Sequence, residues 1–70
     1  MEINDTVKTL VEMKFKERGY DVIIPKGSIG RICEVHDTWA FVEVAAQGLP
    51  EGEGVFEFDF SEIEVIKKCS

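Results

Sequence analysis

The chain has 70 residues, of which 44% are hydrophobic, so we expect one small globular domain over residues 1–70. Its 14 acidic residues outnumber the 8 Lys and Arg residues, and the formal net charge of −6 argues against a generic binder of nucleic acids or anionic membranes. No apolar run approaches the length of a transmembrane helix, and the N-terminus lacks the basic and apolar regions of a secretory signal. We therefore expect a cytoplasmic protein.

The N-terminal third begins with a predicted strand and continues as a long loop. Alternate residues of segment 6–13 share one apolar face, which indicates a strand. A helix capped by Asp5 is the alternative, but the β-branched content favours the strand. Residues 14–25 carry several charges and a glycine turn, and their apolar run 22–24 should be extended because it precedes a proline.

The clearest signal is a hairpin of two strands, residues 28–36 and 39–45, joined by a tight turn at residues 37–38. The apolar residues of the first strand do not share one parity. We therefore expect a bend or bulge near residues 30–32, where Gly30 permits it. The apolar residues concerned are Ile29, Ile32 and Val35.

The C-terminal third predicts a loop, a strand, a helical turn and a last strand. Residues 46–54 contain three glycines and a proline, which is typical of a loop. A strand at 55–59, a helical turn at 60–63 and a strand at 64–67 follow. The predicted core collects the inward-facing residues of all strands, namely Val7, Val11, Ile29, Ile32, Val35, Val42, Val44, Phe56, Phe58, Ile63 and Val65.

Five short strands in so small a chain must share one core, and a partly open barrel buries one face of each. The pattern Pro-x-Gly-x-x-Gly over residues 25–30, followed by hydrophobic residues at 32 and 35, resembles small bacterial SH3-like (KOW-like) barrel domains. The resemblance spans residues 4–66. It implies an all-β fold, a five-stranded antiparallel SH3-like barrel with one short helical turn before the last strand.

Signals for chemistry are weak. Cys33 and His36 have the spacing of half a metal site, but residues three apart in a strand point to opposite faces, and the chain has too few Cys and His for a structural zinc site. A domain of this size rarely encloses a pocket in which a carboxylate acquires a shifted pKa. We expect no catalytic residue, no metal and no cofactor. Cys33 and Cys69 should be reduced thiols, although a bridge between them stays open.

The acidic residues are concentrated. Residues 34–66 hold nine Asp and Glu and no Lys or Arg, which indicates either a solvated surface or a face that attracts a basic partner. If the small aliphatic residues of strand 39–45 face the core, Trp39 and Phe41 lie outside; alternatively, the bend turns them inward or residues 14–24 cover them. The predicted partner-binding residues are Trp39, Phe41, Glu43, Glu57 and Asp59.

These features predict a non-enzymatic protein-interaction module that docks a protein partner, with a homodimer through Trp39 and Phe41 as one form of docking. One alternative is an acidic inhibitor of the immunity-protein or antirepressor type, which blocks a basic nucleic-acid-binding protein. Another is a KOW-like binder of RNA or the ribosome, with Lys14, Lys16 and Arg18 as its basic cluster. The net charge disfavours direct nucleic-acid binding.

Overall fold

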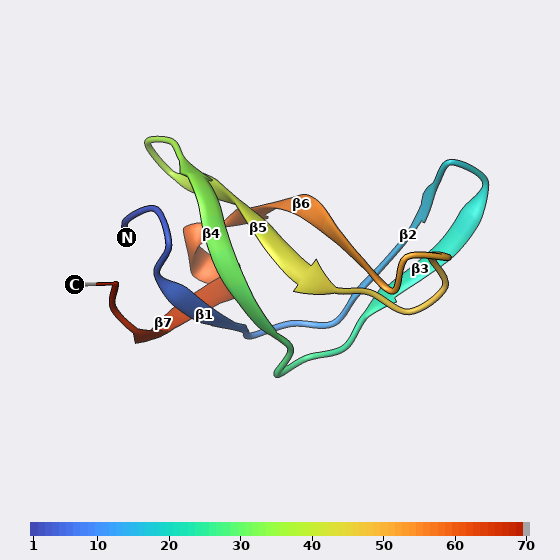
Figure 1. Cartoon of the computed structure of the whole chain (residues 1–70), viewed down its shortest axis with the longest axis horizontal. Coiled ribbons are helices and arrows are strands. Elements are labelled where there is room, and N and C mark those ends of the chain that lie inside the picture. Colours follow the sequence, from blue (N-terminus) through green and yellow to red (C-terminus); the bar gives the residue numbers. More distant parts are fainter. Residues whose placement is uncertain (70) are drawn as a thin grey trace.

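The computed structural model describes residues 1–69 and contains seven β-strands and one short 3-10 helix (Figure 1). In chain order these are β1 (Thr6–Thr9), β2 (Met13–Glu17), β3 (Tyr20–Ile24), β4 (Ile29–Val35), β5 (Trp39–Ala45), β6 (Glu53–Asp59), η1 (Phe60–Glu62) and β7 (Ile63–Lys67). Five strands form one antiparallel sheet in the order β6-β5-β4-β1-β7, and β2 and β3 pair as a separate hairpin. Within residues 1–69, no helix has the length and apolar character needed to cross a bilayer.

The five strands of the large sheet are the five that the sequence predicts, so the all-β class with a five-stranded antiparallel sheet is confirmed. Strand β5 has the predicted limits, and η1 lies within the predicted helical turn. At the start of that turn the Asp59 backbone N–H donates to the Glu62 carboxylate at 2.9 Å. This contact closes the corner between β6 and β7.

The prediction for residues 6–25 is partly wrong, because β1 ends at Thr9 and a hairpin replaces the expected loop. The expected extended conformation of residues 22–24 is confirmed, since they belong to β3. The buried Thr9 hydroxyl donates to the Pro25 carbonyl and accepts from the Ser28 N–H, both at 3.0 Å. These bonds tie the end of β1 to the segment between β3 and β4, and the chain leaves the large sheet after Thr9. Strands β2 and β3 then meet at Arg18 and Gly19, whose φ angles of 52° and 83° fit the tight turns that hairpins favour.

The core contains residues from all five strands of the large sheet, from β3 and from loop 46–52. Two predicted core residues are wrong, since Val11 is 37% exposed and Ile29 is 54% exposed. Val35 and Val65 pack only partly buried against the core. The buried hydrophobic residues are Val7, Val22, Ile24, Ile32, Ala40, Val42, Val44, Ala46, Leu49, Phe56, Phe58 and Ile63.

A bulge in β4 explains which residues face inward. Ile32 is opposite Val42, but Glu34 is opposite the next residue of β5, Phe41, so Cys33 is the extra residue. The predicted bulge near residues 30–32 therefore lies slightly later in the chain. Beyond it the parity of β4 changes, so that Ile32 and Val35 both face the core while Glu34 is exposed.

Loop 46–52 packs against the hairpin. The backbones of Ile23 and Gln47 exchange two hydrogen bonds, at 2.9 and 2.8 Å, and Leu49 is buried. Arg18 in the hairpin turn donates to Glu51 at 2.7 Å. The loop therefore adds core residues to the domain, which its glycine and proline content does not predict.

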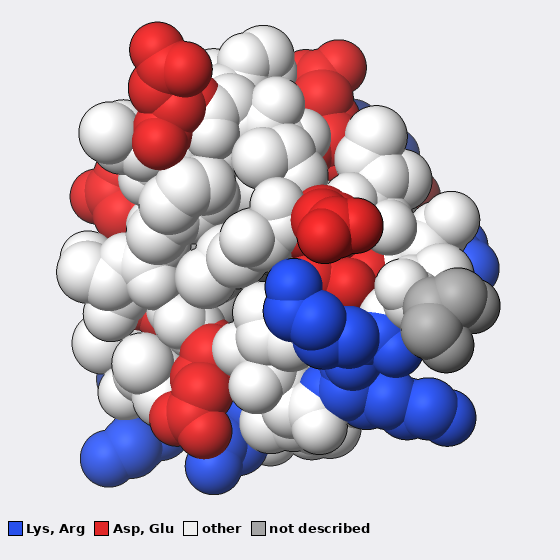
Figure 2. Space-filling model, turned by 90° about the vertical axis from the view of Figure 1, so that its left-hand side faces the viewer, with Lys and Arg blue, Asp and Glu red and all other residues white. Residues whose placement is uncertain are grey.

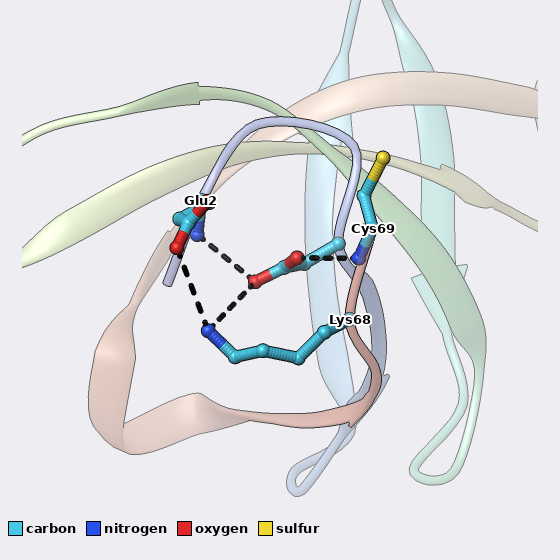
Figure 3. A network of polar contacts seen from close by, with 4 residues as sticks. Glu2, Lys68 and Cys69 are labelled. Carbon is cyan, nitrogen blue, oxygen red and sulfur yellow. Dashed lines mark hydrogen bonds and ion pairs between the residues drawn. The ribbon is translucent and has the colours of Figure 1, made fainter.

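Asp5 joins the two ends of the chain (Figure 3). Its side chain is fully buried, and its two carboxylate oxygens accept the backbone N–H groups of Glu2 and Cys69, each at 3.0 Å. Lys68 Nζ lies 3.8 Å from one of these oxygens. The Cys69 hydrogen bond is the main cause that lowers the pKa of Asp5, and burial opposes it.

Replacing Asp5 with asparagine is expected to lower the melting temperature at neutral pH, because an amide offers one acceptor oxygen where two N–H groups need one each. Folding lowers the pKa of Asp5, so its stabilisation is complete above the ordinary value of about 3.9 and is lost as the pH falls below it. The difference in melting temperature between wild type and Asp5→Asn should therefore narrow in acid. Asp37→Asn, at an exposed turn residue, is the control, and a pH-independent difference for Asp5→Asn would contradict this assignment.

Candidate functional site

The predicted partner-binding residues lie together on the outer face of β5 and β6. Trp39 is directly opposite Asp59, and Phe41 is directly opposite Glu57. Glu43 follows on β5 two residues further, opposite Val55. Side chains opposite each other on one face of an antiparallel pair are close neighbours, so the register gathers all five predicted residues.

Trp39 and Phe41 point away from the core. Ala40 and Val42, which alternate with them, have 0% exposure, whereas both aromatic residues are partly exposed. The hairpin packs on the core side, where the Phe15 ring lies edge-on to Phe56 at 5.2 Å between centroids. This alternation therefore does not support the alternative in which the two aromatic side chains turn toward the core.

His36 completes the aromatic cluster, and sequence reasoning missed it. Its ring stacks on Trp39 with centroids 4.0 Å apart and planes 14° apart, while Trp39 and Phe41 meet edge-on at 5.0 Å and 87°. The sequence contains a signal for this contact, because a two-residue turn at 37–38 places His36 opposite Trp39. In the structure the His36 N–H donates to the Trp39 carbonyl at 2.8 Å. Each such ring pair is worth about 0.5–1.5 kcal/mol beyond its buried area.

The β4 side of this surface carries two polar contacts between side chains. Glu34 Oε2 lies 2.6 Å from His36 Nε2, and Arg31 contacts Glu43 at 3.4 Å. Because segment 34–66 contains no Lys or Arg, the sequence suggests that no basic residue offsets the repulsion between Glu43 and nearby acids. Arg31, which precedes that segment, contacts Glu43 and offsets this repulsion. We call the whole surface the aromatic–acidic face; it comprises Arg31, Glu34, His36, Trp39, Phe41, Glu43, Glu57 and Asp59.

On the β6 side the carboxylates have no close basic neighbour among the described residues. Within residues 1–69, neither Glu57 nor Asp59 has a Lys or Arg nitrogen within 4.0 Å, and both residues are exposed. Figure 2 shows the end of the molecule that is at the left of Figure 1; Lys and Arg atoms gather low on this end, and Asp and Glu atoms surround an uncharged surface above them. The acids thus border uncharged surface instead of forming one continuous charged patch.

The basic cluster proposed for RNA contact consists of residues that face carboxylates. Lys14 lies 3.6 Å from Glu12, and Lys16 lies 3.7 Å from Asp21. Arg18 contacts Glu51 at 2.7 Å, and this hydrogen bond raises the pKa of Arg18 and lowers that of Glu51. Acidic neighbours at each cation weaken the attraction of this cluster for phosphates.

Metal-ligating side chains do not form a cluster among residues 1–69. The described residues include no group of three or more His, Cys, Asp or Glu placed to hold a metal ion, and Cys33 and Cys69 are free, exposed thiols. The apolar groove between β2 and β6 contains one carboxylate, Glu57, beside Phe15 and Phe56. Lys14 also lines that groove, so it holds one carboxylate and one lysine side chain.

Partly exposed aromatic rings beside carboxylates suit contact with a cationic surface, since the rings supply apolar area and the carboxylates supply attraction. The aromatic–acidic face combines both within three neighbouring strands. It is therefore the strongest candidate site of the described residues. Comparisons of this chain with models of protein families, with curated proteins and with solved structures give no match.

Proposed function

We propose that this protein is a non-enzymatic interaction module that docks a basic region of a protein partner on its aromatic–acidic face. The observation that carries the proposal is the register of β5 and β6, which sets Trp39 beside Asp59 and Phe41 beside Glu57. Interfaces commonly place aromatic residues at the centre and charged residues at the rim. The acidic rim would speed encounter with a basic partner.

We further propose that the fold is an SH3-like barrel. The hairpin inserted after the first sheet strand and the 3-10 turn before the last strand support this assignment. A cytoplasmic location, with both thiols reduced, fits the same proposal.

The acidic inhibitor is the second candidate, and the nine acidic residues of segment 34–66 favour it. Its partner would be a protein whose own ligand is a nucleic acid, and the carboxylates would occupy the phosphate-binding surface. Competition with nucleic acid distinguishes the two candidates. DNA or RNA should displace this protein from its partner only if the protein is an inhibitor that occupies the partner's nucleic-acid-binding surface. A competition titration with a captured basic partner therefore separates them.

Reversing Glu57 and Asp59 to lysine together is the direct test of the docking face. The probe is a 12-residue peptide of alternating glycine and basic residues, titrated at low and high salt by calorimetry. We expect the double variant to lose about tenfold or more in affinity, and the loss to shrink as salt screens the charges. Thermal melting of the same variant should show nearly unchanged stability, because both side chains are exposed and one pair of like charges replaces another.

The control is Glu12→Lys with Glu64→Lys, which changes the net charge equally at exposed residues outside the aromatic–acidic face. Equal losses in the control and in the Glu57→Lys, Asp59→Lys variant would show that net charge alone attracts the peptide. That result would remove the docking face as a site.

A further inference from the structure

We infer that the aromatic–acidic face takes up an arginine side chain of the partner, which lies flat on Trp39 and bonds to the carboxylates of Asp59 and Glu57. This inference rests on the proposed docking function and specifies the chemistry of the contact. It follows from which ring faces are covered and which carboxylates already have partners.

The ring separations show where Trp39 is uncovered by aromatic neighbours. The centroid of Trp39 lies 4.0 Å from that of His36 and 5.0 Å from that of Phe41, and the last two are 6.3 Å apart. These three lengths form a triangle with nearly a right angle at Trp39. His36 therefore covers one face of the indole, Phe41 lies beside its edge, and neither ring covers the second face.

The strand register shows what that second face looks toward. His36 precedes the turn on the β4 side, where its N–H bonds to the Trp39 carbonyl. On the opposite side of Trp39, the direct cross-strand neighbour is Asp59 of β6. Because the stacking direction runs across the strands, the second indole face is directed toward β6 and its short aspartate side chain.

The carboxylates on the β4 side and on the β6 side of Trp39 also differ in whether they have partners. On the β4 side, Glu34 contacts His36 and Glu43 contacts Arg31. On the β6 side, Glu57 and Asp59 have no Lys, Arg or His nitrogen within 4.0 Å in the described part of the chain. An incoming cation thus meets uncompensated carboxylates on the same side as the uncovered indole face.

Arginine fits this geometry better than lysine. Its planar guanidinium stacks on an indole face and keeps its N–H donors in the plane, where they reach carboxylates beside the ring. Two carboxylates spaced two residues apart on one strand, as in Glu57 and Asp59, lie on the same face and offer acceptors on that side. A lysine ammonium is a point charge and gains no comparable stacking area.

The test compares two peptides of equal length and charge, one of alternating Gly and Arg and one of alternating Gly and Lys. We expect the arginine peptide to bind wild type about three- to tenfold more tightly, a range that cation–π contacts supply. The preference should vanish in Trp39→Leu. Tyr20→Leu, at an aromatic residue that is 42% exposed outside the face, should retain it.

A second readout needs no variant. Trp39 is the only tryptophan, so the single indole N–H resonance in an NMR titration reports the contact directly. The arginine peptide should shift it strongly and the lysine peptide weakly, even if Trp39→Leu does not fold.

Three outcomes would overturn the inference. Equal binding of both peptides, with sensitivity to reversal of Glu57 and Asp59, would leave docking intact but show plain charge attraction. Insensitivity of both peptides to that reversal would instead remove the proposed function. Concentration-dependent dimerisation without peptide, abolished by Trp39→Leu, would show that a second copy of this chain occupies the face.

Discussion

Phe58→Ala is expected to destabilise the domain by about 3–5 kcal/mol, which is comparable to the whole stability of a chain of this size. Phe58 is fully buried in β6, directly opposite Ala40, and it is the largest of the fully buried side chains. A small residue opposite it cannot fill the cavity that its removal leaves. Urea denaturation followed by circular dichroism and by Trp39 fluorescence should show a largely unfolded protein or a greatly reduced midpoint.

Val55→Ala on the same strand is the control. Val55 faces the other side of the sheet and is 49% exposed, so its truncation should change the free energy of unfolding by less than about 0.5 kcal/mol. A Phe58→Ala variant that loses under about 1 kcal/mol would mean that β6 does not close this core.

Alternation made β5 and β6 predictable. In β5 buried residues alternate with more exposed ones, in β6 exposed residues alternate with less exposed ones, and the two strands pair along their full length. The same alternation placed Trp39 and Phe41 outside, because the residues between them are small and aliphatic. Their gathering with Glu57 and Asp59 depends on the β5–β6 register, which the long connecting loop does not reveal.

The hairpin of β2 and β3 was missed although its signal was present. Met13 and Phe15 alternate with Lys14 and Lys16, and the chain then reaches Gly19. The density of charge favoured a solvated loop, but each lysine lies on the outer side of a half-buried strand. Tertiary packing of Phe15 against Phe56 decides the outcome, and no local pattern encodes that contact.

The bulge decides the composition of the aromatic–acidic face. Cys33 is the extra residue of β4, so that Glu34 lies opposite Phe41. After this change of parity, the turn places the His36 ring against Trp39. The mismatch of Ile29, Ile32 and Val35 predicts an irregularity, but it does not specify at which residue. The position of the bulge follows from packing, because Ile32 and Val35 pack in or against the core while Ile29 is exposed.

Gly48→Ala is expected to destabilise the domain by roughly 2–5 kcal/mol, for two reasons that add. Gly48 has a φ of +97°, which side-chain-bearing residues rarely adopt. A Cβ at this position would also overlap the Asp21 carbonyl oxygen, which belongs to the backbone of β3 and cannot turn aside as a side chain would. The substitution must therefore shift loop 46–52 away from the hairpin.

Gly52→Ala separates the two causes. Gly52 lies in the same loop with a φ of +77°, but a Cβ there would meet nothing within 4 Å, so only the backbone cost of about 1–2 kcal/mol applies. Hydrogen exchange should show faster exchange of the Ile23 and Gln47 amides in Gly48→Ala than in Gly52→Ala, because those amides bond across the contact that the new methyl group disrupts. Equal stability and equal exchange in the two variants would mean that the loop does not pack on β3. Peptide binding at the aromatic–acidic face should survive in any folded fraction of Gly48→Ala, since none of the residues of that face lies in the loop.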